Sequence, residues 1–465
     1  MMRESTRMKD GTQMKGGRKE SSCISTGTRA DRRLGLYIHI PFCVQKCLYC
    51  DFLSAPAGEG ESERYVEALC REIVREGKTY ADYTVRTIYI GGGTPSLLSG
   101  DLILRILTLV YRSFRVEKDC EISLEANPGT VTDDKLKDWR RAGVNRISLG
   151  AQSLQDEELK ALGRIHDSQT FLDTYNMIIE SGFNNINIDL MSGIPCQSLD
   201  SYRDTLEKVV SLKKRPPHIS AYGLIVEEGT PFFENTPQLP DEDCEREMYA
   251  LTGELLAKFG YSRYEISNYA LPGYECRHNI GYWRRENYLG LGLGAASLIE
   301  NVRFRNSRDM RRYEQTQELS RESGQGQEKI LPGVSRQGQE KALPGVSRQG
   351  QEKTLSGGSR QGQEKTLSGG SEAFHEKQQV LSIEEQMEEF MFLGLRMTKG
   401  VSREEFFRAF GRDIDEVYPG IVENFCKKGL LRERKDGKTG RTWISLTDYG
   451  MDISNYVMAD FLLTV

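Results

Sequence analysis

The sequence predicts an α/β protein in two parts. The larger part is a parallel sheet of six βα units curled into a partial (β/α)6 barrel of the TIM type, and the smaller part is a C-terminal α+β unit of winged-helix type. Two observations support this. Short apolar strands alternate with amphipathic helical segments from residue 35 to about 225, and two helical patterns precede two strand-like runs near the C-terminus. A chain of 465 residues has room for both parts.

The barrel elements follow from hydrophobic periodicity. A strand is expected at 36–40, and the helix after it at 62–78, where Tyr65, Leu69 and Ile73 recur on one face. Cys70 shares that face and is therefore expected in the core. Thr132 is a helix start signal and Gly143 a stop signal. Further strands are expected at 87–90, 121–125, 146–149, 185–190 and 218–222, with a helix at about 101–114.

The C-terminal unit begins with Met387, Met391 and Leu395 at helical spacing. Ser402 and Glu405 then have the spacing of a capping box, which predicts the start of a second helix. Strand-like runs follow at 429–431 and 442–446. Because the unit is not strongly basic, we expect it to pack against or cover the barrel mouth and not to bind DNA.

Two segments lack the composition of folded structure. Residues 1–33 are rich in Gly, Ser, Lys and Arg and predict a disordered tail. Within 318–374 a 12-residue sequence recurs from Gln327, Gln339, Gln351 and Gln363, with too few apolar residues to stack as a solenoid. The predicted organisation is a tail at 1–33, a barrel with an extension at 34–317, an insert at 318–374 and a C-terminal unit at 375–465.

Composition limits the class of protein. Lys and Arg number 63 against 68 Asp and Glu, a net charge of −5, which gives no electrostatic reason to expect a nucleic-acid partner. No apolar run approaches the length of a membrane span, and the polar N-terminus does not resemble a secretory signal. We therefore expect a cytoplasmic protein without structural disulfides.

Three cysteines carry the strongest chemical signal. Cys43, Cys47 and Cys50 have the spacing C-x₃-C-x₂-C directly after the first predicted strand. Three thiolates can hold three corners of a cubane iron–sulfur cluster and leave the fourth iron open to a small molecule. A structural zinc site is the alternative, but it needs a fourth ligand, and Asp51 and Phe52 follow instead.

Polar or glycine-rich positions follow the other strands, where parallel barrels place their sites. Gly91-Gly-Gly-Thr-Pro95 lets backbone approach a ligand closely, with a tight βα turn as the alternative. Asn127-Pro128 indicates a turn. The remaining polar candidates have either a binding role or a capping role, and they are Glu125, Gln152, Arg164, Asp189 and Tyr222.

These motifs together resemble the radical S-adenosylmethionine proteins related to oxygen-independent coproporphyrinogen III oxidase. The resemblance covers about 35–316 and 376–460. It implies that Cys43, Cys47 and Cys50 bind a [4Fe–4S] cluster whose fourth iron is chelated by S-adenosylmethionine. The positions that match the surroundings of this cosubstrate are Tyr37, Tyr49, Gly92, Gly93, Thr94, Glu125, Gln152, Arg164, Asp189, Gly223 and Ala296.

The family has two main branches. The oxidase carries one more cysteine where this chain has Phe52, whereas the haem-chaperone branch has Cys-Asp-Phe, Tyr264-Glu-Ile-Ser-Asn268 and Arg277-His-Asn279, all present here. The resemblance therefore implies haem binding and transfer to apoproteins of the respiratory chain, with contact at a membrane surface. Oxidative decarboxylation of coproporphyrinogen III is the enzymatic alternative, and a plain electron-transfer protein is a third.

Two residues are left open at this point. His278 is a candidate haem ligand, because neutral imidazole is a common axial ligand, and a structural hydrogen-bonding role is equally compatible with its motif. Cys196 stands where the family has glycine after an Ile-Pro pair, which predicts either a perturbed turn or a tolerated substitution.

Overall fold

The computed structural model describes residues 32–323 and 375–463. The predicted tail and repeat insert therefore lie outside the described residues, apart from their inner ends. At those ends Arg33 already opens the first strand, and a helix, α10 (Met310–Ser323), continues into the range assigned to the insert.

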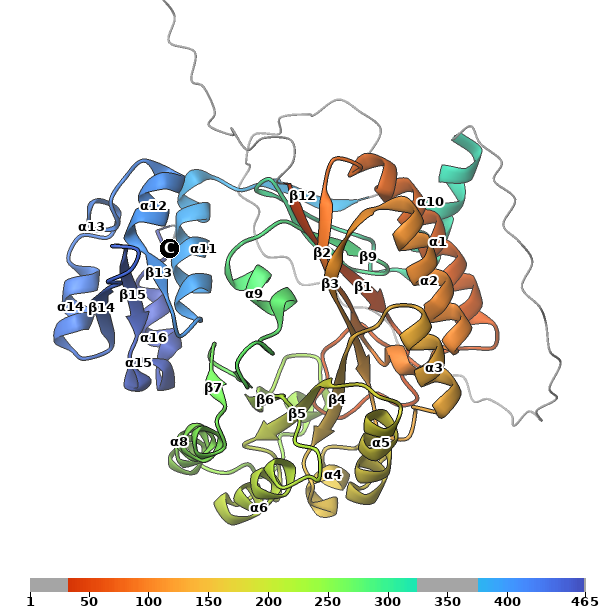
Figure 1. The fold of residues 1–465 in the computed structure, drawn as a ribbon, viewed down its shortest axis with the longest axis horizontal. Helices are drawn as coiled ribbons and strands as arrows, with labels where there is room; N and C mark the ends of the chain where they lie inside the picture. Colours follow the sequence, from red (N-terminus) through yellow and green to blue (C-terminus); the bar gives the residue numbers. More distant parts are fainter. Residues whose placement is uncertain (1–31, 324–374, 464–465) are drawn as a thin grey trace, which may run out of the picture.

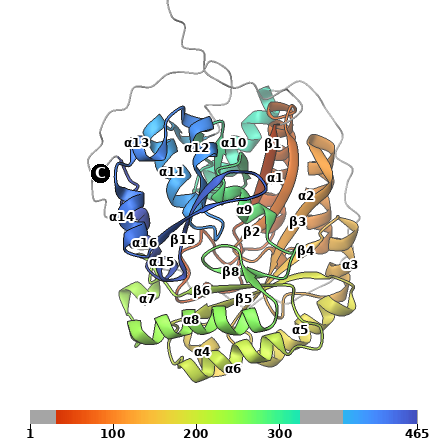
Figure 2. The same cartoon turned by 60° about the vertical axis from the view of Figure 1, so that its left-hand side comes forward.

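Six parallel strands form the centre of the molecule, as predicted (Figure 1). Each is hydrogen-bonded to the next in chain order, and helices cover the outer face (Figure 2). The strands are β1 (Arg33–Ile40), β2 (Thr84–Gly92), β3 (Arg115–Ala126), β4 (Arg146–Gln152), β5 (Asn185–Ser192) and β6 (His218–Gly223). The helices are α1 (Glu61–Thr79), α2 (Gly100–Ser113), α3 (Asp133–Arg141), α4 (Asp156–Ala161), α5 (Ser168–Glu180), α6 (Leu199–Val210), α7 (Pro231–Glu234) and α8 (Glu242–Lys258), with a short 3-10 turn, η1 (Pro95–Leu97).

The helix signals read from the sequence are confirmed in detail. Thr132 caps α3, its hydroxyl accepting the N–H of Lys135. Gly143 follows the helix with a φ of 93°, a conformation that glycine adopts without steric cost. Cys70 is buried in the main core, as expected from its place on the inner face of α1.

Strands on both sides extend the sheet to twelve, and these were not predicted. On the β1 side the order is β9, β10, β11, β12, and on the β6 side it is β8, β7. The edge strands β12 and β7 do not pair with each other, so the barrel stays open. The added strands are β7 (Ser262–Arg263), β8 (Asn268–Ala270), β9 (Tyr288–Leu291), β10 (Ala296–Ile299), β11 (Val302–Arg305) and β12 (Glu376–Val380).

The inner face of the barrel is polar and the outer face is apolar. In β1, Leu36, Ile38 and Ile40 are fully buried under the helices, while Tyr37 and His39 alternate with them and face inward. The same alternation in β2 to β6 buries hydroxyl, carboxyl, guanidinium and imidazole groups inside the barrel. The helix α9 (Arg277–Trp283) lies against strand β2.

The C-terminal unit packs beside α9 and β7 (Figure 1). Its helix α11 contacts α9, and Glu389 on α11 forms ion pairs with Arg285 and Arg303 at 2.8 Å each. Three antiparallel strands complete it, with Ser402 capping α12 as predicted. Its elements are α11 (Ile383–Leu395), β13 (Val401–Ser402), α12 (Arg403–Phe410), α13 (Ile414–Val417), α14 (Ile421–Lys427), β14 (Leu431–Lys435), β15 (Thr442–Leu446), α15 (Asp448–Asp452) and α16 (Ser454–Ala459).

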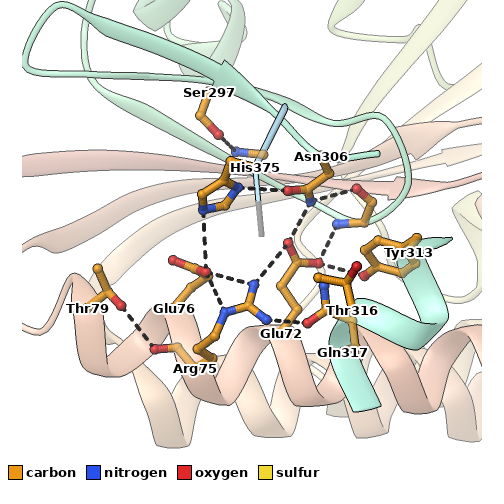
Figure 3. Close-up of polar contacts among 12 residues, drawn as sticks. Glu72, Arg75, Glu76, Thr79, Ser297, Asn306, Tyr313, Thr316, Gln317 and His375 are labelled. Carbon is orange, nitrogen blue, oxygen red and sulfur yellow. Dashed lines mark hydrogen bonds and ion pairs between the residues drawn. The ribbon is translucent and has the colours of Figure 1, made fainter. Parts of the chain in front are cut away.

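A buried polar cluster joins α1 to the chain on both sides of residues 324–374 (Figure 3). Glu72 on α1 accepts hydrogen bonds from Tyr313 and Asn306, each at 2.6 Å. His375 lies 3.1 Å from Asn306 and 3.8 Å from Glu76, the next buried carboxylate of α1. The segments before and after the insert are therefore held at the same helix.

Candidate functional site

The three cysteines lie on the loop after β1, where the sequence predicted a cluster. The thiols of Cys43, Cys47 and Cys50 are free and half-buried. The loop is fixed at its base, because the N–H of Cys43 bonds to the carbonyl of Ala55 at 3.1 Å. Burial raises the pKa of Cys50.

The donor set of this loop suits an iron–sulfur cluster better than a single zinc ion. A cubane cluster needs each thiolate at a different iron, so its ligands are spread over several metal atoms. Three free thiols lie on one loop, and Asp51 and Phe52 follow the last of them in the sequence, which matches that donor set better than tetrahedral zinc.

Polar side chains from the segments after β2 and after α4 reach two of the thiols. The Thr94 hydroxyl lies 3.5 Å from Cys43 Sγ, and Arg164 Nη1 lies 3.6 Å from Cys47 Sγ. Asn127 links these two residues, since its amide nitrogen donates to Thr94 and its carbonyl oxygen accepts from Arg164, at 2.9 and 3.0 Å. A hydroxyl and a guanidinium can therefore donate hydrogen bonds to these two sulfurs.

The glycine-rich segment packs tightly against the cysteine loop. The N–H groups of Gly93 and Thr94 donate to the carbonyls of Ile40 and Phe42. A Cβ on Gly93 would lie 2.6 Å from the Phe42 oxygen, and one on Gly92, whose φ is 114°, would lie 2.5 Å from the His39 ring. The close approach expected of these glycines is therefore made to the chain itself.

Glu125 sits inside the barrel beside this segment. It accepts hydrogen bonds from the Tyr89 hydroxyl at 2.8 Å and from the N–H of Gly92 at 3.0 Å. Burial raises its pKa to about 7, helped by the charge of Asp189. Asp189 is itself bonded to Ser148 at 3.0 Å and to Asn187 at 2.7 Å, and burial raises its pKa too.

Gln152 and Arg164 meet at the end of β4. Gln152 has a φ of 67°, a left-handed conformation that non-glycine residues adopt at a cost and that clusters at functional sites. A Cβ at Gly150 would lie 3.0 Å from Gln152 Nε2 and 3.2 Å from Arg164 Nη2. Because position 150 is glycine, these two polar side chains and Asn127 can converge next to the cysteine loop.

Four further predicted residues lie on β1, the cysteine loop, β10 and β6. Tyr37 donates or accepts a 2.9 Å hydrogen bond with His39, whose other nitrogen bonds to the Leu53 carbonyl, and burial raises the Tyr37 pKa. Tyr49 is on the loop itself, and burial raises its pKa as well. Ala296 opens β10, where the chain turns back beside β9, and Gly223 ends β6 with no atom within 4 Å of a Cβ built there.

His278 is buried beside Gly35, near the start of β1. It reaches the other predicted residues through Tyr89, which donates to Glu125. Thr87 and Tyr282 occupy its two ring nitrogens at 2.8 and 3.0 Å, and its ring stacks on Tyr89. Burial, with the charge of Arg146, lowers its pKa to about 3. These contacts favour the hydrogen-bonding role that the sequence left open for this residue.

The chain is similar in sequence to named proteins of several bacteria. The chain is 33% identical over 431 residues to "Heme chaperone HemW" of Lactococcus lactis, covering 92% of this chain and 97% of that protein. The chain belongs to the HemW family of heme chaperones. The HemW of Bacillus subtilis is 31% identical over 92% of this chain and 98% of its own length. The HemW of Escherichia coli is 46% identical over 56% of this chain and 69% of its own.

Domain and fold comparisons agree with membership of the HemW family. Residues 37–209 match the Radical SAM superfamily and 381–438 match the HemN C-terminal domain. The structure "Coproporphyrinogen III oxidase (HemN) from Escherichia coli is a Radical SAM enzyme" superposes with a TM-score of 0.71 at 21% identity, covering 93% of this chain and 91% of that one. The radical SAM fold is thus shown, and a radical SAM domain implies a [4Fe–4S] cluster and S-adenosylmethionine. No helix among the described residues of this HemW-family chain is long and apolar enough to cross a membrane.

Sequence reasoning missed some residues of the site. Asn127 was interpreted as a turn signal, yet it joins Thr94 to Arg164. Its place directly after the strand that carries Glu125 is the signal that could have identified it. Ser148 and Tyr89, which hold Asp189 and Glu125, have no sequence signal beyond strand alternation.

Proposed function

We propose that this chain is a haem chaperone that binds a [4Fe–4S] cluster, S-adenosylmethionine and haem, and delivers the haem to apoproteins. The near full-length match to "Heme chaperone HemW" carries the proposal. The partners are haem and haem-accepting apoproteins, among them those of the respiratory chain, met in the cytoplasm and at the membrane surface.

The residues around the cysteine loop suit both a [4Fe–4S] cluster and S-adenosylmethionine. Cys43, Cys47 and Cys50 would hold three irons of the cluster, which when bound supplies electrons and one iron with an open position. Thr94 and Arg164 contact two of these thiols and would donate hydrogen bonds to the sulfurs that hold the cluster. The surroundings of S-adenosylmethionine would be Tyr37, Tyr49, Gly92, Gly93, Thr94, Glu125, Gln152, Arg164, Asp189, Gly223 and Ala296.

The buried carboxylates have a defined task in this arrangement. Glu125 and Asp189 face the barrel interior, and each already accepts hydrogen bonds from neighbouring side chains. When ionised, they can accept further hydrogen bonds from an amine or from ribose hydroxyls. Because burial raises the pKa of Glu125 to about 7, its capacity to accept such hydrogen bonds grows as the pH rises through neutrality.

The first test compares haem binding with oxidase activity. Haemin is added to anaerobically reconstituted protein while the Soret band is followed, and coproporphyrinogen III decarboxylation is assayed in parallel. We expect a one-to-one haem complex and no porphyrinogen product. Formation of protoporphyrinogen without a stable haem complex would overturn the proposal in favour of the oxidase.

The second test examines the cluster ligands. Cys43→Ala, Cys47→Ala and Cys50→Ala should each lose iron and the cluster's visible absorbance after reconstitution. Cys426→Ala is the matched control, because Cys426 is a half-buried free thiol of the C-terminal unit. Full iron content in all three loop variants would contradict the assignment.

A further inference from the structure

Large apolar side chains are exposed around the cysteine loop. We call them the exposed rim, and they come from three segments: the loops after β1 and α4, and the stretch after β6 that includes α7. Their exposed fractions run from 36% at Leu48 to 69% at Ile225, and an apolar group of this kind usually marks a binding surface. The rim consists of Val44, Leu48, Phe52, Ile165, Ile225 and Phe233.

The three segments contact one another through Leu48. Its N–H donates to the carbonyl of Leu162 at 3.2 Å, and its carbonyl accepts the N–H of Phe232 at 3.1 Å. Leu162 and Phe232 belong to one buried apolar cluster with Met191 and Ile194, against which Leu224 and Val226 also pack. Ile165, Ile225 and Phe233 thus each lie within three residues of a member or neighbour of this cluster.

The rim borders the loop that carries the thiols. Ile165 follows Arg164, whose guanidinium lies 3.6 Å from Cys47 Sγ. Val44, Leu48 and Phe52 are interleaved with the three cysteines in the sequence. A flat apolar ligand resting on the rim would therefore lie at the edge of the cluster loop.

We propose that the exposed rim is the surface that binds haem, an inference that rests on the proposed function. Haem combines a large apolar face with two carboxylates, so it needs exposed apolar side chains and a cation at one border. Lys46, at the exposed tip of the same loop, supplies the cation.

The acidic border of the rim sets the orientation and excludes another occupant. Glu227, Glu228 and Glu234 are exposed beside Ile225 and Phe233. They repel carboxylates, so the haem propionates point toward Lys46 and away from the loop after β6. The same three charges disfavour an anionic lipid surface as the occupant.

The test is a haemin titration of the reconstituted full chain. Phe52→Ala combined with Ile165→Ala removes two exposed apolar side chains, which are 61% and 62% exposed. This double variant should bind haemin roughly tenfold more weakly, or weaker still. The control pair, Tyr111→Ala with Tyr449→Ala, is 47% and 60% exposed and lies elsewhere, so it should bind haemin as the wild type does. Cluster absorbance in each variant reports an intact barrel.

The outcomes separate this inference from the proposed function. If the wild type does not bind haemin, the proposed function and the inference fall together. If the wild type binds and the rim pair binds equally well, or if the control pair loses as much affinity, the inference alone is overturned. It is also overturned if the rim pair keeps its haemin affinity but loses binding to phosphatidylglycerol vesicles.

Discussion

The Tyr313 hydroxyl donates a 2.6 Å hydrogen bond to Glu72, joining the last helix before residues 324–374 to the first helix of the barrel (Figure 3). Glu72 also accepts from the N–H of Gly292 at 2.8 Å and from Asn306. Burial raises its pKa to about 7, while Arg75 and these hydrogen bonds act in the opposite direction. One fully buried carboxylate therefore holds four segments together.

Glu72→Gln should destabilise the protein by roughly 1–3 kcal/mol at pH 8. The reason is that the NH2 group of the new glutamine side chain would face a buried hydrogen-bond donor where a carboxylate oxygen now accepts. Denaturant unfolding at equilibrium measures the loss. Glu63→Gln, an exposed position on the same helix, is the control and should change stability little. Equal stability of the two variants would show that the cluster does not fasten the segments.

Glu125 should make stability depend on pH. Its pKa is about 7 in the folded chain against 4.5 for the ordinary carboxyl, so the folded state holds the proton more tightly. The contribution of Glu125 to the free energy of unfolding is then fully present below about pH 4.5 and is lost as the pH rises through about 7. Glu125→Gln should flatten the unfolding free energy over this window, whereas the exposed Glu157→Gln should not. An unchanged slope in the Glu125 variant would refute the assignment.

Cys196 adopts a φ of 66° on an exposed turn, which explains why the family pattern has glycine there. A non-glycine residue in this region costs on the order of 1 kcal/mol. Cys196→Gly should therefore raise the free energy of unfolding by up to about 1 kcal/mol. Cys196→Ala keeps the Cβ and should give no gain, so a gain in the alanine variant would point to the thiol instead of the backbone.

His278→Gln should lower stability by roughly 1–3 kcal/mol, because the hydrogen bonds to Thr87 and Tyr282 are fully buried. The haem complex should keep its Soret position and one-to-one stoichiometry. Thermal unfolding and haemin titration on the same preparation separate the two roles. A lost or shifted Soret band at unchanged stability would make His278 the haem ligand.

The sequence predicted the barrel well because its period-two and helical patterns are long and regular. From the order of the strand ends, the sequence predicted that Cys43, Glu125, Gln152 and Asp189 lie at one edge of the sheet. Strands β9 to β11, of four residues each, were missed because so short a run carries no clear alternation.

Contacts between distant residues were beyond sequence reasoning. Glu72 and Tyr313 are 241 residues apart, and nothing local in either segment marks the partner. His278 illustrates a second limit, because a motif can be compatible with two roles. Its motif permits both a ligand and a structural role, and its contacts with Thr87 and Tyr282, which the sequence does not show, favour the structural one.

The unclosed barrel leaves two strand edges that another chain could extend by backbone pairing, and each edge is defended differently. The β7 edge is only two residues long, and Arg263 on it is tied to Asp448 of the C-terminal unit at 2.8 Å. The β12 edge has the sequence Glu-Lys-Gln-Gln-Val, which is polar and charged apart from Val380. Short length, a covering contact and charge are the features by which natural sheets resist edge-to-edge aggregation. The open barrel is therefore a poor template for edge-to-edge pairing with another copy of the chain.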